Sequence, residues 1–150
     1  MKLNHEEVLN VLPHRPPMLF VDQVVELEPL QYIKTKLYID ENWEIFKGHF
    51  KDDPVFPGVL SVEAMAQATD IMCMVVPEYA GKAPLFAGIE GVRFFKRIDP
   101  GTTIYCIAKA VTVDKERALI TADCAVSFLP EAELTGEGVA AKATIIIAMR

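Results

Sequence analysis

The segment from Gly58 to Val76 constrains the fold more than any other part of this sequence, because it has the length of a helix and is apolar nearly all round. Pro57 suits the first turn of a helix, where a missing N–H costs nothing, and Pro77 fits the end of one. A helix that is apolar on every side is stable only when other elements surround it. The sequence therefore predicts one long buried helix over residues 58–76.

The rest of the chain shows mainly the two-residue alternation of half-buried strands. A short amphipathic helix is expected near Glu6–Val11, and a short turn over Trp43–Phe46 that Asp40 or Asn42 could cap. Strands are expected over Met18–Leu27, Tyr32–Ile39, Phe86–Phe95, Thr103–Val113, 118–128 and 139–147. About six strands and one long helix favour an α+β fold, with a curved antiparallel sheet wrapped around the helix in one domain over residues 1–150.

Charge and composition argue against several classes of function. The net charge of −6 disfavours a nucleic-acid binder, which usually has a strong basic excess. The N-terminus lacks the pattern of a signal peptide, and no run reaches the roughly 18 apolar residues that span a bilayer. We therefore expect a cytoplasmic protein without a membrane partner.

The cysteines and histidines do not form a metal-binding or redox pattern. Cys73, Cys106 and Cys124 lie in apolar segments without metal or redox spacing, so buried thiols are expected. The three histidines are scattered along the chain. We expect neither a metal nor another cofactor.

The start of the long helix holds residues that could carry chemistry. A carboxylate in an apolar site is costly to ionise, so Glu63 in the second turn could carry a proton at neutral pH. Gln67 lies one turn further along the same face and can hydrogen-bond that carboxyl. The amides of Gly58 and Val59 are unpaired donors at the positive end of the helix, where they could polarise a carbonyl oxygen.

His49 lies in the irregular loop before this helix and could act as a base. A base, a proton donor and an oxyanion site together suit the removal of a proton beside a carbonyl with loss of water from the next carbon. Each residue also has a simpler interpretation: His49 as a loop histidine bonded to backbone, Glu63 as an ion-paired or interface carboxylate, and Gly58 as a turn residue.

Three stretches of the chain resemble the FabZ family, the 3-hydroxyacyl-[acyl-carrier-protein] dehydratases of type II fatty-acid synthesis. They are Leu12–Asp22, Gly48–Gln67, and Phe86–Phe94 followed by Pro100 and Gly101. The sequence departs from the family at Lys51, where proline is usual, and within residues 14–17, where proline replaces a commonly aromatic residue. The resemblance implies a hydro-lyase that converts (3R)-hydroxyacyl chains to trans-2-enoyl thioesters.

The resemblance further implies a hotdog fold and a homodimer, often assembled as a trimer of dimers. It implies that His49 takes the C2 proton and that Glu63, from the other subunit, protonates the departing hydroxyl. Gly58 and Val59 would hold the thioester carbonyl, and Gln67 would orient Glu63. Glutamate at position 63 favours a simple dehydratase over the related dehydratase–isomerases, which carry aspartate.

The partner implied by the resemblance is an acyl carrier protein bearing a phosphopantetheine-linked acyl chain. Phe50, Arg93 and Phe94 are expected at the acyl-binding site. Because carrier proteins are acidic and this chain is acidic overall, docking needs a local basic patch. Arg93, Lys96 and Arg97, in or just after the strand that the resemblance places along the acyl tunnel, are the best candidates, although ordinary solvated charges remain the alternative.

Other functions stay open on the sequence alone. A hotdog acyl-thioester hydrolase would share the fold and the substrate handle. A non-catalytic acyl-binding or regulatory hotdog module would be expected to lack the base or the acid. The same dehydration could also serve a specialised lipid or polyketide pathway. His14, between Pro13 and Arg15, is expected to be structural rather than catalytic.

Overall fold

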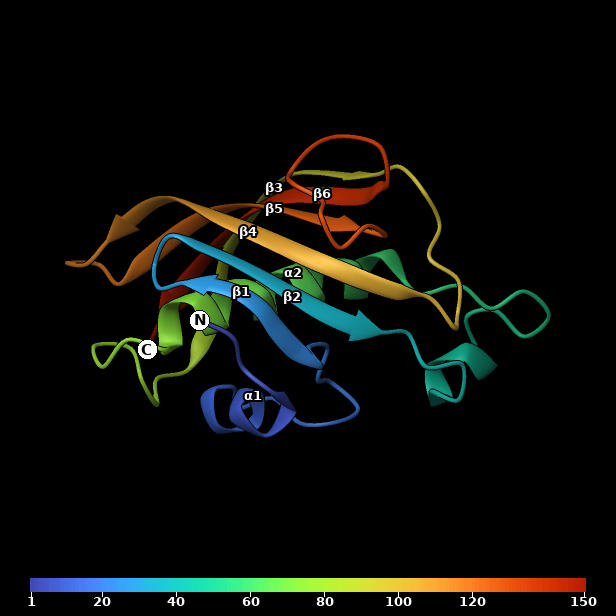
Figure 1. Ribbon diagram of the computed structural model, residues 1–150, viewed down its shortest axis with the longest axis horizontal. Helices are drawn as coiled ribbons and strands as arrows, with labels where there is room; N and C mark the ends of the chain where they lie inside the picture. Colours follow the sequence, from blue (N-terminus) through green and yellow to red (C-terminus); the bar gives the residue numbers. More distant parts are fainter.

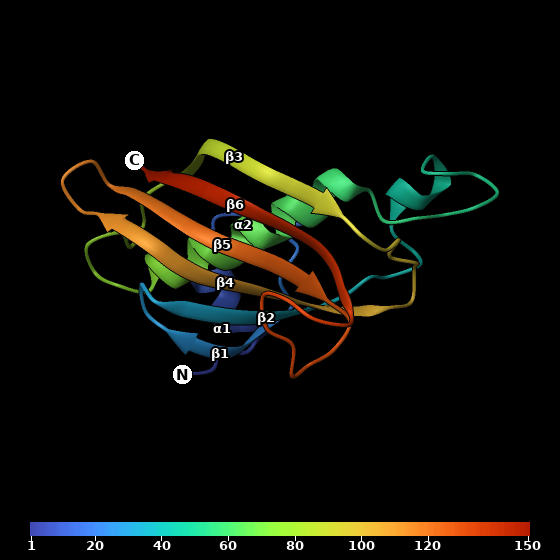
Figure 2. The same cartoon turned by 90° about the horizontal axis from the view of Figure 1, so that it is seen from above.

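The computed structural model describes residues 1–150 and contains a six-stranded sheet in which every neighbouring pair of strands is antiparallel. In sheet order the strands are β1 (Gln23–Glu28), β2 (Tyr32–Tyr38), β4 (Thr103–Asp114), β5 (Leu119–Ser127), β6 (Val139–Met149) and β3 (Pro84–Phe94). The sheet curves around the long helix α2 (Gly58–Met74), which lies against one face (Figures 1 and 2). The predicted hotdog arrangement is therefore confirmed.

Helix α2 forms the centre of the core because it has almost no polar face. Thirteen of its 17 residues are buried, and the hydrophobic ones among them belong to a cluster of 35 buried hydrophobic residues that extends over the sheet. Residues 75 and 76, predicted as helix, form a turn after its end. Cys73, Cys106 and Cys124 are all buried and unpaired, as predicted. Neither helix of the structure is long and apolar enough to cross a membrane.

The prediction that the first strand begins at Met18 is wrong, because β1 begins only at Gln23. Around Met18 and Phe20 the backbone is bonded to a side chain instead of to a neighbouring strand. The N–H of Phe20 donates to Oε1 of Gln67 at 2.7 Å, and the carbonyl of Met18 accepts from Nε2 of Gln67 at 2.7 Å. A glutamine of α2 therefore takes the place of a strand partner.

The other elements agree closely with prediction. Helix α1 (His5–Val11) is present, with Asn4 and Glu7 forming a capping box, and the other five strands begin and end within two residues of their expected limits. The predicted turn is a 3₁₀ helix, Glu44–Lys47, but no side chain caps it. The Asp40 carboxylate instead accepts from the backbone N–H of Asn42. The chain from Asn42 to Pro57 extends beyond the end of the sheet (Figures 1 and 2).

Candidate active site

His49 lies in this projecting loop, and a backbone carbonyl fixes its ring. Its Nδ1 is 2.8 Å from the carbonyl oxygen of Val55. Because a carbonyl oxygen only accepts, Nδ1 carries the proton and donates it. The neutral ring then has a bare lone pair on Nε2, which is the form that a base requires. A second bond, from the Val55 N–H to the His49 carbonyl at 2.9 Å, closes the loop around the ring.

His49 lines a cavity of about 390 Å³ between its loop, the start of α2 and the chain that follows β3. Four other residues that the sequence predicts for the site also line it. These are Gly58, Phe94, Lys96 and Arg97. Of the remaining predicted residues, Phe50 stacks on the His49 ring with 4.1 Å between ring centroids, while Val59, Glu63, Gln67 and Arg93 are not among the lining residues.

Gly58 allows close packing at the wall of this cavity. A β-carbon at this position would lie 2.9 Å from Cε1 of Phe94, so any side chain would force the aromatic ring to move. The amides of Gly58 and Val59 donate no hydrogen bond within the chain, and no side chain caps the helix before them. Two free donors therefore stand at the positive end of α2. The Val59 side chain itself is 74% exposed.

Glu63 is held by Gln67, through the bond that their spacing on the helix predicts. Nε2 of Gln67 donates to Oε2 of Glu63 at 2.8 Å. The same amide is fully buried and is fixed by Met18 and Phe20. The side chain of Gln67 therefore joins the carboxyl to the segment before β1 and restricts its orientation.

His14, which the sequence suggested to be merely structural, contacts the same carboxyl. Its Nε2 lies 3.6 Å from Oε2 of Glu63. Burial lowers the pKa of His14, and this effect outweighs the opposing attraction of Glu63. Residue spacing could not reveal this contact, because two strands and a long loop separate the residues along the chain.

A single chain does not bring His49 and Glu63 together in the cavity. Gly58 and Ser61 line this cavity. At 3.6 residues per turn, both positions lie roughly 140–160° around the helix from the position of Glu63. Glu63 instead lies beside His14, with its side chain 18% exposed. The predicted base and acid therefore lie on different sides of the start of α2.

β3 lies at the edge of the sheet and pairs only with β6. Its free edge carries large apolar side chains that remain exposed, and such an edge readily pairs with another chain. These side chains are Leu85, Phe86, Ile89 and Phe94.

The predicted docking cations differ in their surroundings. Arg97 binds Asp53 at 2.9 Å and Asp99 at 2.8 Å, so two carboxylates already balance its charge. The bond from Arg97 lowers the pKa of Asp53. Lys96 and Arg93 form no ion pair and are exposed.

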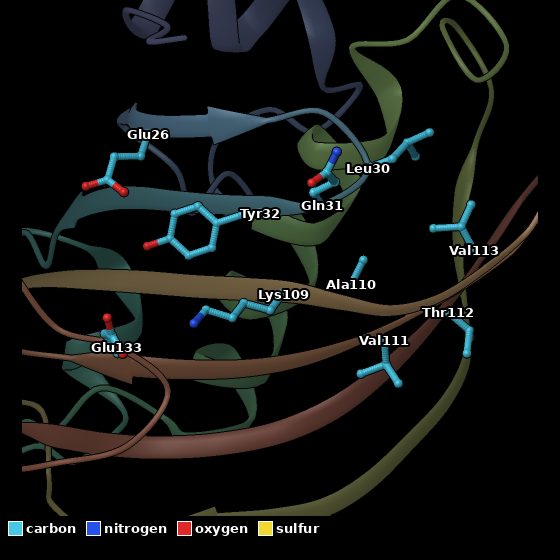
Figure 3. A pocket seen from close by; sticks show the side chains of 10 residues that line it. All are labelled: Glu26, Leu30, Gln31, Tyr32, Lys109, Ala110, Val111, Thr112, Val113 and Glu133. Carbon is cyan, nitrogen blue, oxygen red and sulfur yellow. The ribbon is translucent and has the colours of Figure 1, made fainter.

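A larger cavity, about 690 Å³, lies on the face of the sheet away from α2. Tyr32 and Lys109 face each other across neighbouring strands there, with Glu26 and Glu133 nearby (Figure 3). Burial, together with Glu26, raises the pKa of Tyr32 to about 12. None of the residues predicted for chemistry lines this cavity.

Comparison with known proteins identifies the family. The family model described as a FabA-like domain matches residues 12–131. A 3-hydroxyacyl-[acyl-carrier-protein] dehydratase FabZ of Roseiflexus castenholzii is 44% identical over 68% of this chain and 71% of its own length. The protein of the same name from Oenococcus oeni is 45% identical over 73% of this chain and 76% of its own length.

Solved structures support the same fold. The dehydratase heterocomplex ApeI:P from Xenorhabdus doucetiae superposes with a TM-score of 0.75 at 16% identity, covering 95% of this chain and 90% of that one. Cj0977, a virulence protein from Campylobacter jejuni, gives a TM-score of 0.64 at 12% identity, covering 94% and 83%. By its sequence relatives and its fold, the chain belongs to the FabA-like family, among the FabZ dehydratases.

Proposed function

We propose that this chain dehydrates 3-hydroxyacyl thioesters on acyl carrier protein, in fatty-acid synthesis, with His49 as the base and Glu63 as the acid. The observation that carries the proposal is the state of His49. Its Nδ1–H is committed to a carbonyl, its Nε2 is free, and it lines a cavity that reaches the start of α2, where two amides are unpaired. Family membership supports the same hydro-lyase chemistry.

Each group has a defined part in the elimination. The amides of Gly58 and Val59 would hold the thioester oxygen and so stabilise negative charge that develops when C2 loses a proton. Nε2 of His49 accepts that proton, and the C2–H electron pair forms the C2–C3 double bond. The C3–O bond breaks, and Glu63 donates a proton to the departing hydroxyl, which leaves as water. Proton exchange with solvent then restores both side chains.

The proposed site needs a second copy of the chain. His49 and Glu63 lie on different sides of α2 within one copy, whereas the free edge of β3 offers an exposed apolar strand for pairing. A homodimer joined through this edge would cover these side chains and supply the acid from one copy to the base of the other. Assembly of three such dimers remains a prediction.

The carrier protein would dock beside the mouth of the cavity. Lys96 lines that cavity and has no acidic partner, so it is free to attract an acidic surface. Arg97 follows Lys96 in the chain and Arg93 lies three residues before it. We keep both in the proposed docking surface, with Phe50, Phe94 and Arg93 at the acyl-binding site. A cytoplasmic location also remains a prediction.

The test follows the absorbance of a 2-enoyl thioester during hydration, the reverse reaction. His49→Ala and Glu63→Gln should each lower the rate at least about 100-fold, the usual scale for a general acid or base. His5→Ala is the matched control, because this exposed histidine lies away from the cavity and bonds only to the carbonyl of Asp22. Near-normal hydration by either variant would remove that residue from the mechanism. Release of free thiol instead of hydration would indicate the hydrolase.

A further inference from the structure

We propose that His14 is a positioning residue for the acid: its Nε2–H donates to Oε2 of Glu63 as that carboxyl loses its proton, so that the proton delivered to substrate comes from Oε1. The inference rests on the proposed role of Glu63 and deepens it by naming the oxygen that reacts and the residue that selects it.

The two oxygens of Glu63 have different surroundings. Oε2 accepts from Gln67 at 2.8 Å and has Nε2 of His14 at 3.6 Å, whereas Oε1 has no partner within the chain. If Oε2 carried the proton, its O–H and the N–H of Gln67 would be two donors facing each other. The proton of the neutral acid therefore belongs on Oε1. Oε1 is therefore the oxygen that can donate to a departing hydroxyl.

The proton on the His14 ring lies on Nε2. Nδ1 of His14 is buried and has no hydrogen-bond partner. A buried N–H without an acceptor is costly, while a bare nitrogen in the same place loses less. An imidazolium would place an N–H at both positions, so the site favours the neutral ring, and burial lowers the pKa of His14 in the same direction. His14 is then a neutral donor that points at Glu63.

The distance of 3.6 Å gives this donor a catalytic use. It is longer than a formed hydrogen bond, so His14 contributes little while Glu63 is neutral. As negative charge develops on the carboxyl, the N–H can move closer and form a charge-assisted bond. An interaction that is stronger in the transition state than before it is one that raises kcat.

The backbone around His14 is held on both sides. The Arg15 guanidinium donates to the carbonyls of Leu12, His14 and Leu9 at 2.8, 2.7 and 2.8 Å. Further along, the Gln67 amide fixes the carbonyl of Met18 and the N–H of Phe20. The ring therefore reaches Glu63 from a fixed segment, and the residue that orients the acid also fixes that segment.

The other ionisable groups near this carboxyl cannot replace the donor. Asp70, further along the same helix face, is buried, and burial followed by repulsion from Glu63 raises its pKa well above the ordinary value. Arg15 directs its charge at backbone carbonyls. In the proposed dimer, His49 of the second copy faces Glu63 across the substrate. Besides Gln67, His14 is therefore the only nitrogen donor of this chain in contact with Glu63.

The test compares His14→Gln with His14→Asn in dehydration of a 3-hydroxyacyl thioester across pH. A glutamine amide can reach the position of Nε2, whereas the shorter asparagine amide falls near Nδ1. We expect His14→Asn to lower kcat about tenfold with little change in KM, and to move the basic limb of the pH–rate profile upward, because the carboxylate loses a donor that stabilises it. His14→Gln should restore most of kcat and the position of the limb.

A double variant separates this role from a structural one. In a Glu63→Gln background, His14→Asn should cause no further loss, because the acid on which it acts is gone. Equal losses in both backgrounds, an unshifted basic limb, or no rescue by glutamine would each overturn the inference. If Glu63→Gln itself keeps near-normal activity, the proposed function fails at its acid. If only the His14 variants behave like wild type, the inference on His14 fails alone. His5→Asn serves as the control for loss of a histidine.

Discussion

The two sides of the start of α2 differ in how complete they are within one chain. On the Glu63 side, Gln67 bonds both to the carboxyl and to the segment before β1, so the chain itself holds Oε2 of Glu63. On the His49 side, two amides are unpaired, a cavity is open, and the neighbouring edge of β3 is exposed. The proposed acid is thus positioned by its own chain, whereas the proposed base lies beside an open cavity and an exposed strand edge.

This difference indicates where each kind of change should act. Changes around Glu63 should affect the chemistry of the site to which that copy supplies its acid, without affecting assembly, since their contacts are internal. Changes along β3 or after it should affect assembly and docking, since their free surfaces face outward. The following predictions test that division.

Mixed dimers give the largest expected effect. Homodimers of His49→Ala and of Glu63→Gln should each be nearly inactive, but subunits exchanged between them should regain part of the wild-type rate. One of the two sites in such a mixed dimer takes an intact base from one chain and an intact acid from the other. The measurement is enoyl hydration after joint unfolding and refolding. A mixture of His49→Ala with His49→Gln is the control, and activity there, or none in the first mixture, would contradict a shared site.

A charge on the free edge of β3 should separate the copies. Ile89 is 45% exposed on this strand, and Ile89→Glu would place an unpaired charge in the proposed interface, at a cost of about 3–5 kcal/mol. The mass in solution by light scattering should fall to that of one chain, and activity should fall with it. Val111, 57% exposed on β4, is the matched control, since Val111→Glu should leave the mass unchanged. A dimer that survives Ile89→Glu must use another surface.

Lys96 and Arg97 should respond differently to charge reversal. Lys96→Glu should raise KM for carrier-bound substrate up to about tenfold, as expected for a charge at the rim of an interface, and leave a short pantetheine thioester unaffected. Arg97→Glu should slow both substrates, because it also breaks the contacts with Asp53 and Pro54 that hold the His49 loop. Comparing kcat and KM on the two substrates separates the effects. An equal loss on both substrates for Lys96→Glu would remove it from docking.

Asp70 should affect stability rather than catalysis. Because burial raises the pKa of Asp70, the folded chain retains a proton that the unfolded chain loses near pH 4. The stability contributed by this group is fully present below that pH and is lost as pH rises through the folded value. The free energy of unfolding of Asp70→Asn should therefore rise relative to wild type by up to about 1.4 kcal/mol per pH unit between the unfolded and the folded pKa of Asp70. Urea unfolding between pH 4 and 8 measures the difference, and parallel curves for the two proteins would contradict the prediction.

The sequence predicts best what depends on near neighbours. The central helix follows from apolar residues on all its sides between Pro57 and Pro77, and the bond from Gln67 to Glu63 follows from one helical turn. The predicted start of β1 was wrong because Gln67 bonds to Phe20 where a strand partner would otherwise bond, and no local pattern reveals this contact. The contact of His14 with Glu63 was missed for the same reason.

The packing of Gly58 under Phe94 has a consequence for how this protein can change. The ring rests on bare backbone at the wall of the cavity, so it can keep this position only while position 58 lacks a β-carbon. An alanine there would displace the aromatic ring and so reshape this wall of the cavity. A methyl group at position 58 therefore fits best together with a smaller residue at 94, so the choice of residue at one position depends on the other.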